Sequence, residues 1–183
     1  MVDFAFTEAQ QEFTRVVRTF AQQELAPQYA HWDRSGEFPR ELWRKMGEIG
    51  ITGISIPEEY GGQGADCVTA GIAAEEVARG DFNCGYALIE NCLNGEILRH
   101  AQSHVKQKWL GGMTSGETIL AIAVTEPRGG SDAASMQTQA RREGDDYILR
   151  GEKSGISMVM PADGVLVLAK TDPSAGARGV STF

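Results

Sequence analysis

The stretch Val124–Asp132 reads VTEPRGGSD and decides how the rest of the chain is interpreted. It follows an apolar run from Ile119 that is too short for a typical helix and rich in strand-forming residues, so we expect a buried strand. Glycine lets backbone N–H groups surround an anion, and the hydroxyls of Thr125 and Ser131 can donate to carbonyl or phosphate oxygens. The stretch therefore favours a loop at the end of a strand that binds a cofactor with a pyrophosphate.

A purely structural interpretation of this loop stays open. In that interpretation Ser131 or Asp132 caps the next turn, and the glycines only make a tight connection. A second segment, at 151–157, contains Gly155 and Ser157, which can offer backbone and hydroxyl contacts to a planar ligand. On its own this second segment is a weak signal.

The residues around the loop have the two-residue period of β structure. Apolar strand formers alternate or run together between clusters of turn residues, which predicts a hairpin and two further strands. The chain stops inside the last of these, so we expect further residues after Phe183. The predicted strands cover 137–142, 147–150, 165–169 and 180–183.

The first part of the chain has a helical period instead. Thr7 and Gln10 match a capping box, and Pro27 cannot continue the helix that they begin. Apolar residues at helical spacing line one face of it, namely Phe13, Val16, Val17 and Phe20. Further helices are predicted at 39–49, 66–79, 84–99 and 103–110, the last capped by Ser103 and ended by the glycines at 111–112. We therefore predict an α+β fold with an α-helical domain at 1–118 and a β domain at 119–183.

Other polar features are assigned to the surface or to connections. Lys153 is interpreted as a solvated turn residue. The stretch Gly61–Gly64 lacks a G-x-G-x-x-G pattern and is expected to be a flexible connection. The adjacent carboxylates at 58–59 and 75–76 point in different directions on a helix and are expected to be surface charge. The three histidines form no cluster with cysteine or carboxylate ligands, so no metal is expected.

Composition excludes several classes of function. The 25 acidic residues outnumber the 17 Lys and Arg and give a formal charge of −8, which argues against nucleic acid or an anionic membrane as partner. The three cysteines lack C-x-x-C spacing, which fits a reducing compartment. No apolar run approaches the roughly 20 residues that span a bilayer, and Met1–Phe6 has no basic region of a leader. We expect a cytoplasmic protein, or one of the mitochondrial matrix.

The segments Val124–Pro127 and Gly130–Asp132 together resemble the flavin-loop signature of the acyl-CoA dehydrogenase family. The resemblance continues along nearly the whole chain in the family's order. It is carried by the segments Phe6–Gln10, Gly50–Gly53, Ile56–Gly62, Lys108–Leu110 and Leu149–Lys153.

The resemblance implies an amino-terminal α-helical bundle, a middle β-barrel domain that is truncated here, and a third domain outside these residues. It implies FAD as cofactor and an acyl-CoA thioester as substrate. A carboxylate base removes the α-proton while the β-hydrogen passes as hydride to the flavin, which gives a trans-2-enoyl-CoA, and an electron-transfer flavoprotein accepts the electrons. The resemblance places the base in the third domain and implies a homo-oligomer, either a tetramer or a dimer.

The resemblance also assigns flavin contacts to two segments. Thr125 is expected to hydrogen-bond the isoalloxazine, and Ser131 to lie near both the pyrophosphate and the acyl-CoA. Where the family usually has Trp-Ile-Thr, this chain has Gly155-Ile156-Ser157, and the missing aromatic ring suggests space for a ring-shaped acyl group. The full set of expected cofactor contacts is Ile122, Val124, Thr125, Gly130, Ser131, Gly155, Ile156 and Ser157.

Three points stay open at this stage. Acyl-CoA oxidases and some flavin monooxygenases share the scaffold, so the electron acceptor is not decided. A non-catalytic module derived from the fold is the alternative from a different class. The wall of the acyl pocket is also incomplete, because only the helix with Cys84, Leu88 and Cys92 offers one here.

Overall fold

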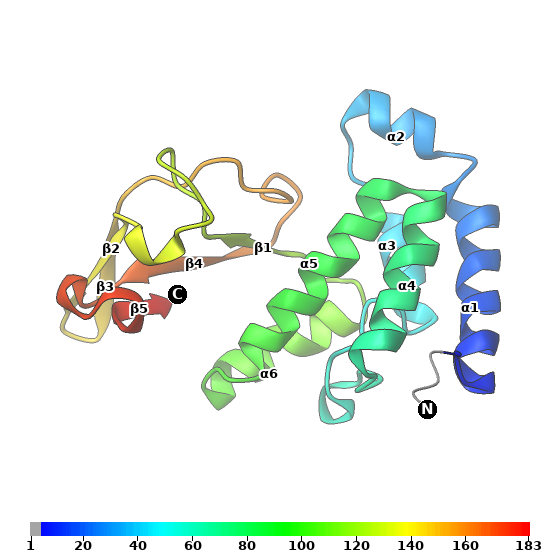
Figure 1. Cartoon of the computed structure of the whole chain (residues 1–183), viewed down its shortest axis with the longest axis horizontal. Helices are drawn as coiled ribbons and strands as arrows, with labels where there is room; N and C mark the ends of the chain where they lie inside the picture. The colour runs from blue at the N-terminus through cyan, green and yellow to red at the C-terminus, as the bar shows by residue number, and fades with distance from the viewer. Residues whose placement is uncertain (1–4) are drawn as a thin grey trace. The chain divides into compact units, whose positions relative to one another are not determined.

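The computed structural model describes residues 5–183 and divides into two compact units, a helical unit that ends at Ile119 and a β unit from Leu120 to Phe183 (Figure 1). The first four residues of the amino-terminal stretch interpreted above lie outside the described residues. The predicted α+β fold class is confirmed.

The first helix, α1 (Glu8–Phe20), begins as its sequence predicts. Thr7 Oγ1 accepts from the Gln10 N–H at 3.2 Å, and the Gln10 side chain accepts from the Thr7 N–H at 3.1 Å. A π-helical turn, η1 (Ala21–Leu25), prolongs the helix almost to Pro27. The apolar face is narrower than predicted, because Val17 is fully buried while Val16 is 50% exposed.

Two short helices follow, of which only the second is predicted. Helix α2 (Tyr29–Ser35) has no fully buried residue and therefore lacks the apolar period that would reveal it. It ends at Gly36, whose φ of 70° is the left-handed conformation common after helices. Helix α3 (Arg40–Glu48) starts after Pro39 and buries Trp43 and Met46.

Helices α4 (Cys67–Gly80) and α5 (Phe82–Leu98) pack side by side in Figure 1. Each begins at an aspartate: Asp66 accepts from the Thr69 N–H at 2.7 Å, and Asp81 from the Cys84 N–H at 3.0 Å. A Cβ placed on Gly85 would lie 2.8 Å from the Ala78 Cα, so the two helices approach closely only because this residue is glycine.

Helix α6 (Ser103–Thr114) differs from the prediction at both ends. Ser103 is its first residue rather than its cap; the cap position is held by Gln102, whose side chain makes no capping hydrogen bond. At the other end the helix continues through the two glycines. A Cβ on Gly112 would lie 2.2 Å from Thr118 Oγ1, so this glycine serves close packing within the helix instead of ending it.

The glycine-containing loop at 57–64 is hydrogen-bonded to the preceding segment and is not the loose connection that we expected. It contains a short 3₁₀ turn, η2 (Glu58–Tyr60). The Gln63 N–H donates to the Gly53 carbonyl, and the Gly64 N–H to the Ile56 carbonyl, both at 2.9 Å. The loop therefore packs as part of the helical unit.

The β unit is an open five-stranded sheet. Strands β2 (Gln139–Glu143) and β3 (Asp146–Arg150) form the predicted hairpin, and β1 (Leu120–Ala123) pairs in parallel with β4 (Gly164–Lys170). The strand order is β1-β4-β2-β3, and β5 (Val180–Thr182) also pairs with β4. The predicted interior and final strands are thus confirmed. Two 3₁₀ turns complete the unit, η3 (Ala133–Ser135) and η4 (Pro173–Gly179).

Candidate functional site

The predicted binding loop leaves the carboxyl end of β1 and folds into a tight turn. The Glu126 N–H donates to the Gly129 carbonyl at 3.1 Å, and the Gly129 N–H donates back to the Glu126 carbonyl at 2.9 Å. Gly129 has a φ of 144°, which a residue with a side chain rarely adopts. The turn leaves Arg128 exposed at its tip.

A close approach inside the loop depends on Gly130. A Cβ on this residue would lie 2.8 Å from Thr125 Oγ1, so glycine lets the chain fold back over Thr125. Thr125 is half-buried and Ser131 is exposed. Asp132 stands at the start of η3, but no side-chain hydrogen bond caps this turn among the described residues. The structure therefore gives no support to capping by Asp132 as the purpose of the loop.

Glu126 is a buried carboxylate that holds the loop against the start of β2. It is 6% exposed and accepts from the backbone N–H groups of Gln137 at 2.6 Å and Thr138 at 2.9 Å. Burial by itself raises the pKa of Glu126, but the hydrogen bonds from Thr138, Gln137 and Lys153 outweigh it and lower the pKa to about 2. A carboxylate that stays ionised and accepts several hydrogen bonds is a poor proton acceptor.

The interpretation of Lys153 as a solvated turn residue is wrong. Its side chain is only 10% exposed, and Nζ donates to the Val124 carbonyl at 2.9 Å and to Glu126 Oε1 at 3.0 Å. The next residue, Ser154, donates its N–H to the Thr125 carbonyl at 3.0 Å. The structure therefore joins the two segments that the sequence singled out separately. No local pattern reveals this, because the oxygen partners of Lys153 lie more than 25 residues earlier in the chain.

The second segment has open space at its centre. Gly155 has a φ of 61°, and no atom of the described residues lies within 4 Å of a Cβ built on it. Ile156 is half-buried and Ser157 is exposed. Met158 has a φ of 57°, an uncommon conformation for a residue with a side chain and a sign of local strain. The segment thus presents a glycine and a hydroxyl next to a constrained backbone.

Both units contain hollows; in the helical unit a second one, of about 380 Å³, lies beside α1, apart from the one along α4 and α5. The hollow in the β unit has a volume of about 160 Å³ and is lined by the binding loop, including Arg128, and by η3. The carboxylates Glu126 and Asp132 also line it, and its volume is smaller than the roughly 300 Å³ of ordinary ligand pockets. The hollow along α4 and α5 has a volume of about 660 Å³. Cys92 lines it, whereas Cys84 and Leu88 are fully buried and do not.

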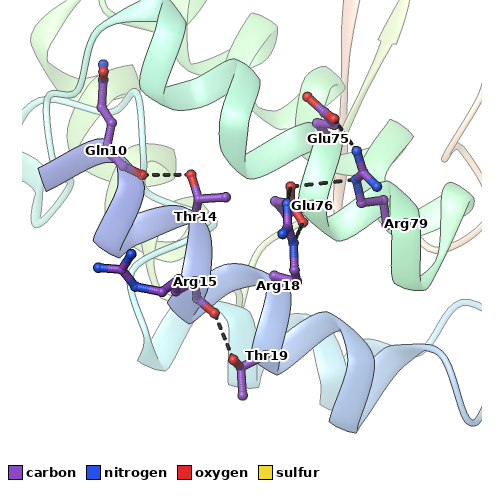
Figure 2. A network of polar contacts seen from close by, with 8 residues as sticks. All are labelled: Gln10, Thr14, Arg15, Arg18, Thr19, Glu75, Glu76 and Arg79. Atoms are coloured by element: carbon purple, nitrogen blue, oxygen red, sulfur yellow. Dashed lines mark hydrogen bonds and ion pairs between the residues drawn. The ribbon is translucent and has the colours of Figure 1, made fainter. Parts of the chain in front are cut away.

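The carboxylates at 75–76 do not behave as a surface pair. Glu76 is 3% exposed and accepts from Arg18 Nε at 2.7 Å and Nη2 at 2.6 Å, as Figure 2 shows. These hydrogen bonds are the main reason why the pKa of Glu76 is lowered. Glu75 is exposed and pairs with Arg79 at 2.7 Å. The surface prediction therefore holds for Glu75 and is wrong for Glu76, whose role is to join α1 to α4.

Residues 5–183 contain neither a cluster of metal ligands nor a membrane-spanning helix. The His, Cys, Asp and Glu side chains in that range form no group of three or more that could hold a metal ion. In the same range, no helix is both long and apolar enough to cross a membrane.

Comparison with known proteins gives matches along nearly the whole chain. Residues 7–117 match the profile of the acyl-CoA dehydrogenase N-terminal domain, and residues 121–183 match that of the middle domain. The 3-(aryl)acrylate reductase of Clostridium sporogenes is 42% identical over 180 residues, which cover 97% of this chain and 48% of that protein. The chain thus spans about half the length of this relative.

Solved structures are also similar to this chain over its whole length. Glutaryl-coenzyme A dehydrogenase in complex with glutaryl-CoA has a TM-score of 0.92 at 36% identity, over 100% of this chain and 47% of that one. A chain in the structure of the electron transferring flavoprotein of Acidaminococcus fermentans has a TM-score of 0.91 at 38% identity, covering 100% and 48%. PigA with FAD and proline has a TM-score of 0.91 at 28% identity, covering 100% and 49%.

Proposed function

Because the chain belongs to the acyl-CoA dehydrogenase family, we propose that the protein containing it uses FAD to oxidise an acyl-CoA thioester to the trans-2-enoyl-CoA. In this proposal residues 1–118 are the amino-terminal helical domain and residues 119–183 are part of the middle domain. The observation that carries the proposal is the junction of the two glycine-containing segments, made by Lys153 and Ser154. If the loop served only to reverse the chain, it would not need to be joined to the second segment at 151–157.

The residues present fit FAD. No described atom lies within 4 Å of a Cβ placed on Gly129 or Gly155, which leaves space for a ligand, and Thr125, Ser131 and Ser157 supply hydroxyls. When bound, the flavin supplies the acceptor for the hydride. The proposed contacts are Ile122, Val124, Thr125, Gly130, Ser131, Gly155, Ile156 and Ser157.

Each hydroxyl has a defined role in the proposal. Thr125 would hydrogen-bond the flavin ring, and Ser131 would lie near both the pyrophosphate and the acyl-CoA. Hydrogen-bond donors in fixed positions stabilise charge that develops in the transition state without reorganising. Glu126 takes no part as a base, because its low pKa makes it a weak proton acceptor and its oxygens already accept from Lys153 and two backbone N–H groups. The proposed base is a carboxylate outside these 183 residues.

The proposed electron acceptor is an electron-transfer flavoprotein. The similarity to a chain in the A. fermentans electron transferring flavoprotein structure supports this partner. Rapid mixing of the reduced protein with such a flavoprotein tests it. Flavin reoxidation that is fast with the flavoprotein and slow in air is expected, and the reverse order would favour an oxidase.

We also propose a ring-bearing acyl group as the preferred substrate. Two observations support this: the open space beside Gly155, and the similarity to a reductase whose name specifies aryl acrylates. The test compares the rates of flavin reduction by a cyclohexanecarbonyl, a 3-phenylpropanoyl and a butyryl thioester. Faster reduction by a ring-bearing thioester is expected, and a clear preference for butyryl contradicts the proposal.

The visible spectrum of the purified full-length protein tests the function itself. We expect flavin absorption that bleaches under anaerobic conditions when the correct thioester is added. A coloured protein that no thioester bleaches would contradict the dehydrogenase activity but not the cofactor. A colourless protein that takes up no FAD would contradict both and favour the non-catalytic module.

A further inference from the structure

The ion pair between Lys153 and Glu126 differs from other ion pairs of the chain in its burial. Their side chains are 10% and 7% exposed, whereas each of ten other pairs, spread over both units, has at least one side chain that is 40% exposed or more. Removing two charges from water costs several kcal/mol, and an apolar pair of similar size often stabilises a fold equally well. The need to hold neighbouring backbone segments in place therefore explains this ion pair better than a gain in fold stability does.

The pair connects three pieces of backbone, at 124–126, 137–138 and 153, that belong to no common element. Lys153 binds the Val124 carbonyl as well as Glu126, and Glu126 binds the N–H groups of Gln137 and Thr138. Thr125 lies between the two points that Lys153 holds. Gly155 follows Lys153 by two residues, so the same side chain fixes the start of the second segment.

We propose that Lys153, through Glu126 and the Val124 carbonyl, is a positioning residue that sets the spacing between the two flavin-contacting segments. The inference rests on the proposed binding of FAD. Lys153 Nζ donates to two oxygens at 2.9 and 3.0 Å and to Met136 Sδ at 3.9 Å, which accounts for its three N–H donors, so it acts on the cofactor through Thr125 and Gly155 rather than by contact. It determines how tightly FAD binds and in what environment the flavin lies.

The test measures the FAD dissociation constant, the flavin absorption spectrum and the flavin midpoint potential in the full-length protein. In Lys153→Met we expect roughly a 10- to 100-fold weaker FAD affinity, the range seen when outer partners of metal ligands are removed. We also expect shifted flavin bands in whatever fraction binds. Lys153→Arg keeps the charge and should recover part of the affinity. Glu126→Gln keeps an acceptor for the backbone and covers the case in which Lys153→Met does not fold.

The matched control is Arg18→Met. It removes the cation from a second buried and paired carboxylate, Glu76, in the helical unit, and is expected to lower stability while leaving the FAD affinity and spectrum unchanged. If Lys153→Met and Glu126→Gln lose stability but bind FAD with wild-type affinity and spectrum, the pair is only structural and the inference is wrong. Wild-type protein that binds no FAD would instead overturn the proposed function.

Discussion

Each unit contains a buried carboxylate that forms an ion pair, Glu76 with Arg18 and Glu126 with Lys153. The two ion pairs join different kinds of structure. In the helical unit, Arg18 reaches Glu76 from a position that is 47% exposed and joins two regular helices, α1 and α4 (Figure 2). In the β unit, Lys153 is 10% exposed and joins irregular segments. Helices already pack through apolar side chains such as Val17, so their ion pair adds stability to an existing contact. The loops are joined by one backbone hydrogen bond, from Ser154 to Thr125, and in our proposal the ion pair sets their spacing.

The largest effect should follow from removing the less exposed cation. Lys153→Met leaves Glu126 buried and charged, and we expect a loss of about 3 kcal/mol, the lower end of the range for breaking a buried pair, because two backbone N–H groups remain. Urea unfolding followed by circular dichroism measures this. A loss below about 1 kcal/mol would mean that the pair is more hydrated than its exposure indicates.

Acid should act on the same pair. The folded pKa of Glu126 is about 2, against an ordinary value of 4.5, because its hydrogen bonds favour the ionised form. A depressed folded pKa stabilises the fold fully above the unfolded pKa and loses this contribution as pH falls through the folded value. The stability difference between wild type and Glu126→Gln should therefore be largest above pH 4.5 and shrink toward pH 2. A difference that is constant over this range would contradict the assignment.

Close helix packing can be compared at two glycines. In Gly85→Ala the new Cβ would meet the backbone of Ala78, which cannot move independently, and we expect a loss of about 1–3 kcal/mol. In Gly71→Ala, also within a helix, no described atom lies within 4 Å of the new Cβ, and a gain of about 0.5–1 kcal/mol is expected. Thermal unfolding of both variants measures the contrast. Equal effects would show that α4 and α5 are less closely packed than described.

The more exposed cation should matter less than Lys153. Arg18→Met removes two hydrogen bonds from Glu76, but Arg79 remains at 3.6 Å, and we expect a measurable loss of stability that is smaller than that in Lys153→Met. Arg15→Met is the control, because its partner Glu12 is on the surface, and the expected loss is under about 0.5 kcal/mol. Tryptophan fluorescence during urea unfolding distinguishes the two. A loss in Arg18→Met as large as that in Lys153→Met would remove the contrast between the units.

Much of the fold is predictable because its signals are local. The capping box at Thr7 and the turn between β2 and β3 each need only a few neighbouring residues, and both are found where the sequence places them. Helix α2 is missed because no apolar period marks it. The end of α6 is misplaced because the role of Gly112 depends on Thr118, which packs against it.

The candidate site is predictable only in part, for the same reason. The glycine loop is visible in the sequence, whereas the position of Lys153 depends on a carboxylate 27 residues away. Glu76 is similar, since its partner Arg18 lies 58 residues earlier. A charged residue with a distant partner looks in sequence like any solvated charge. Ion pairs between segments that are distant in the sequence can therefore be identified only in the structure.

Hydrogen exchange of the full-length protein with and without FAD tests most directly whether the joined segments form the cofactor site. The measurement reports backbone amides in 122–131 and 151–157, with the glycine-containing loop at 57–64 as the internal comparison. We expect FAD to slow exchange in both segments of the β unit and to leave 57–64 unchanged. Unchanged exchange in 122–131 and 151–157 when FAD is bound would contradict the assignment of the site.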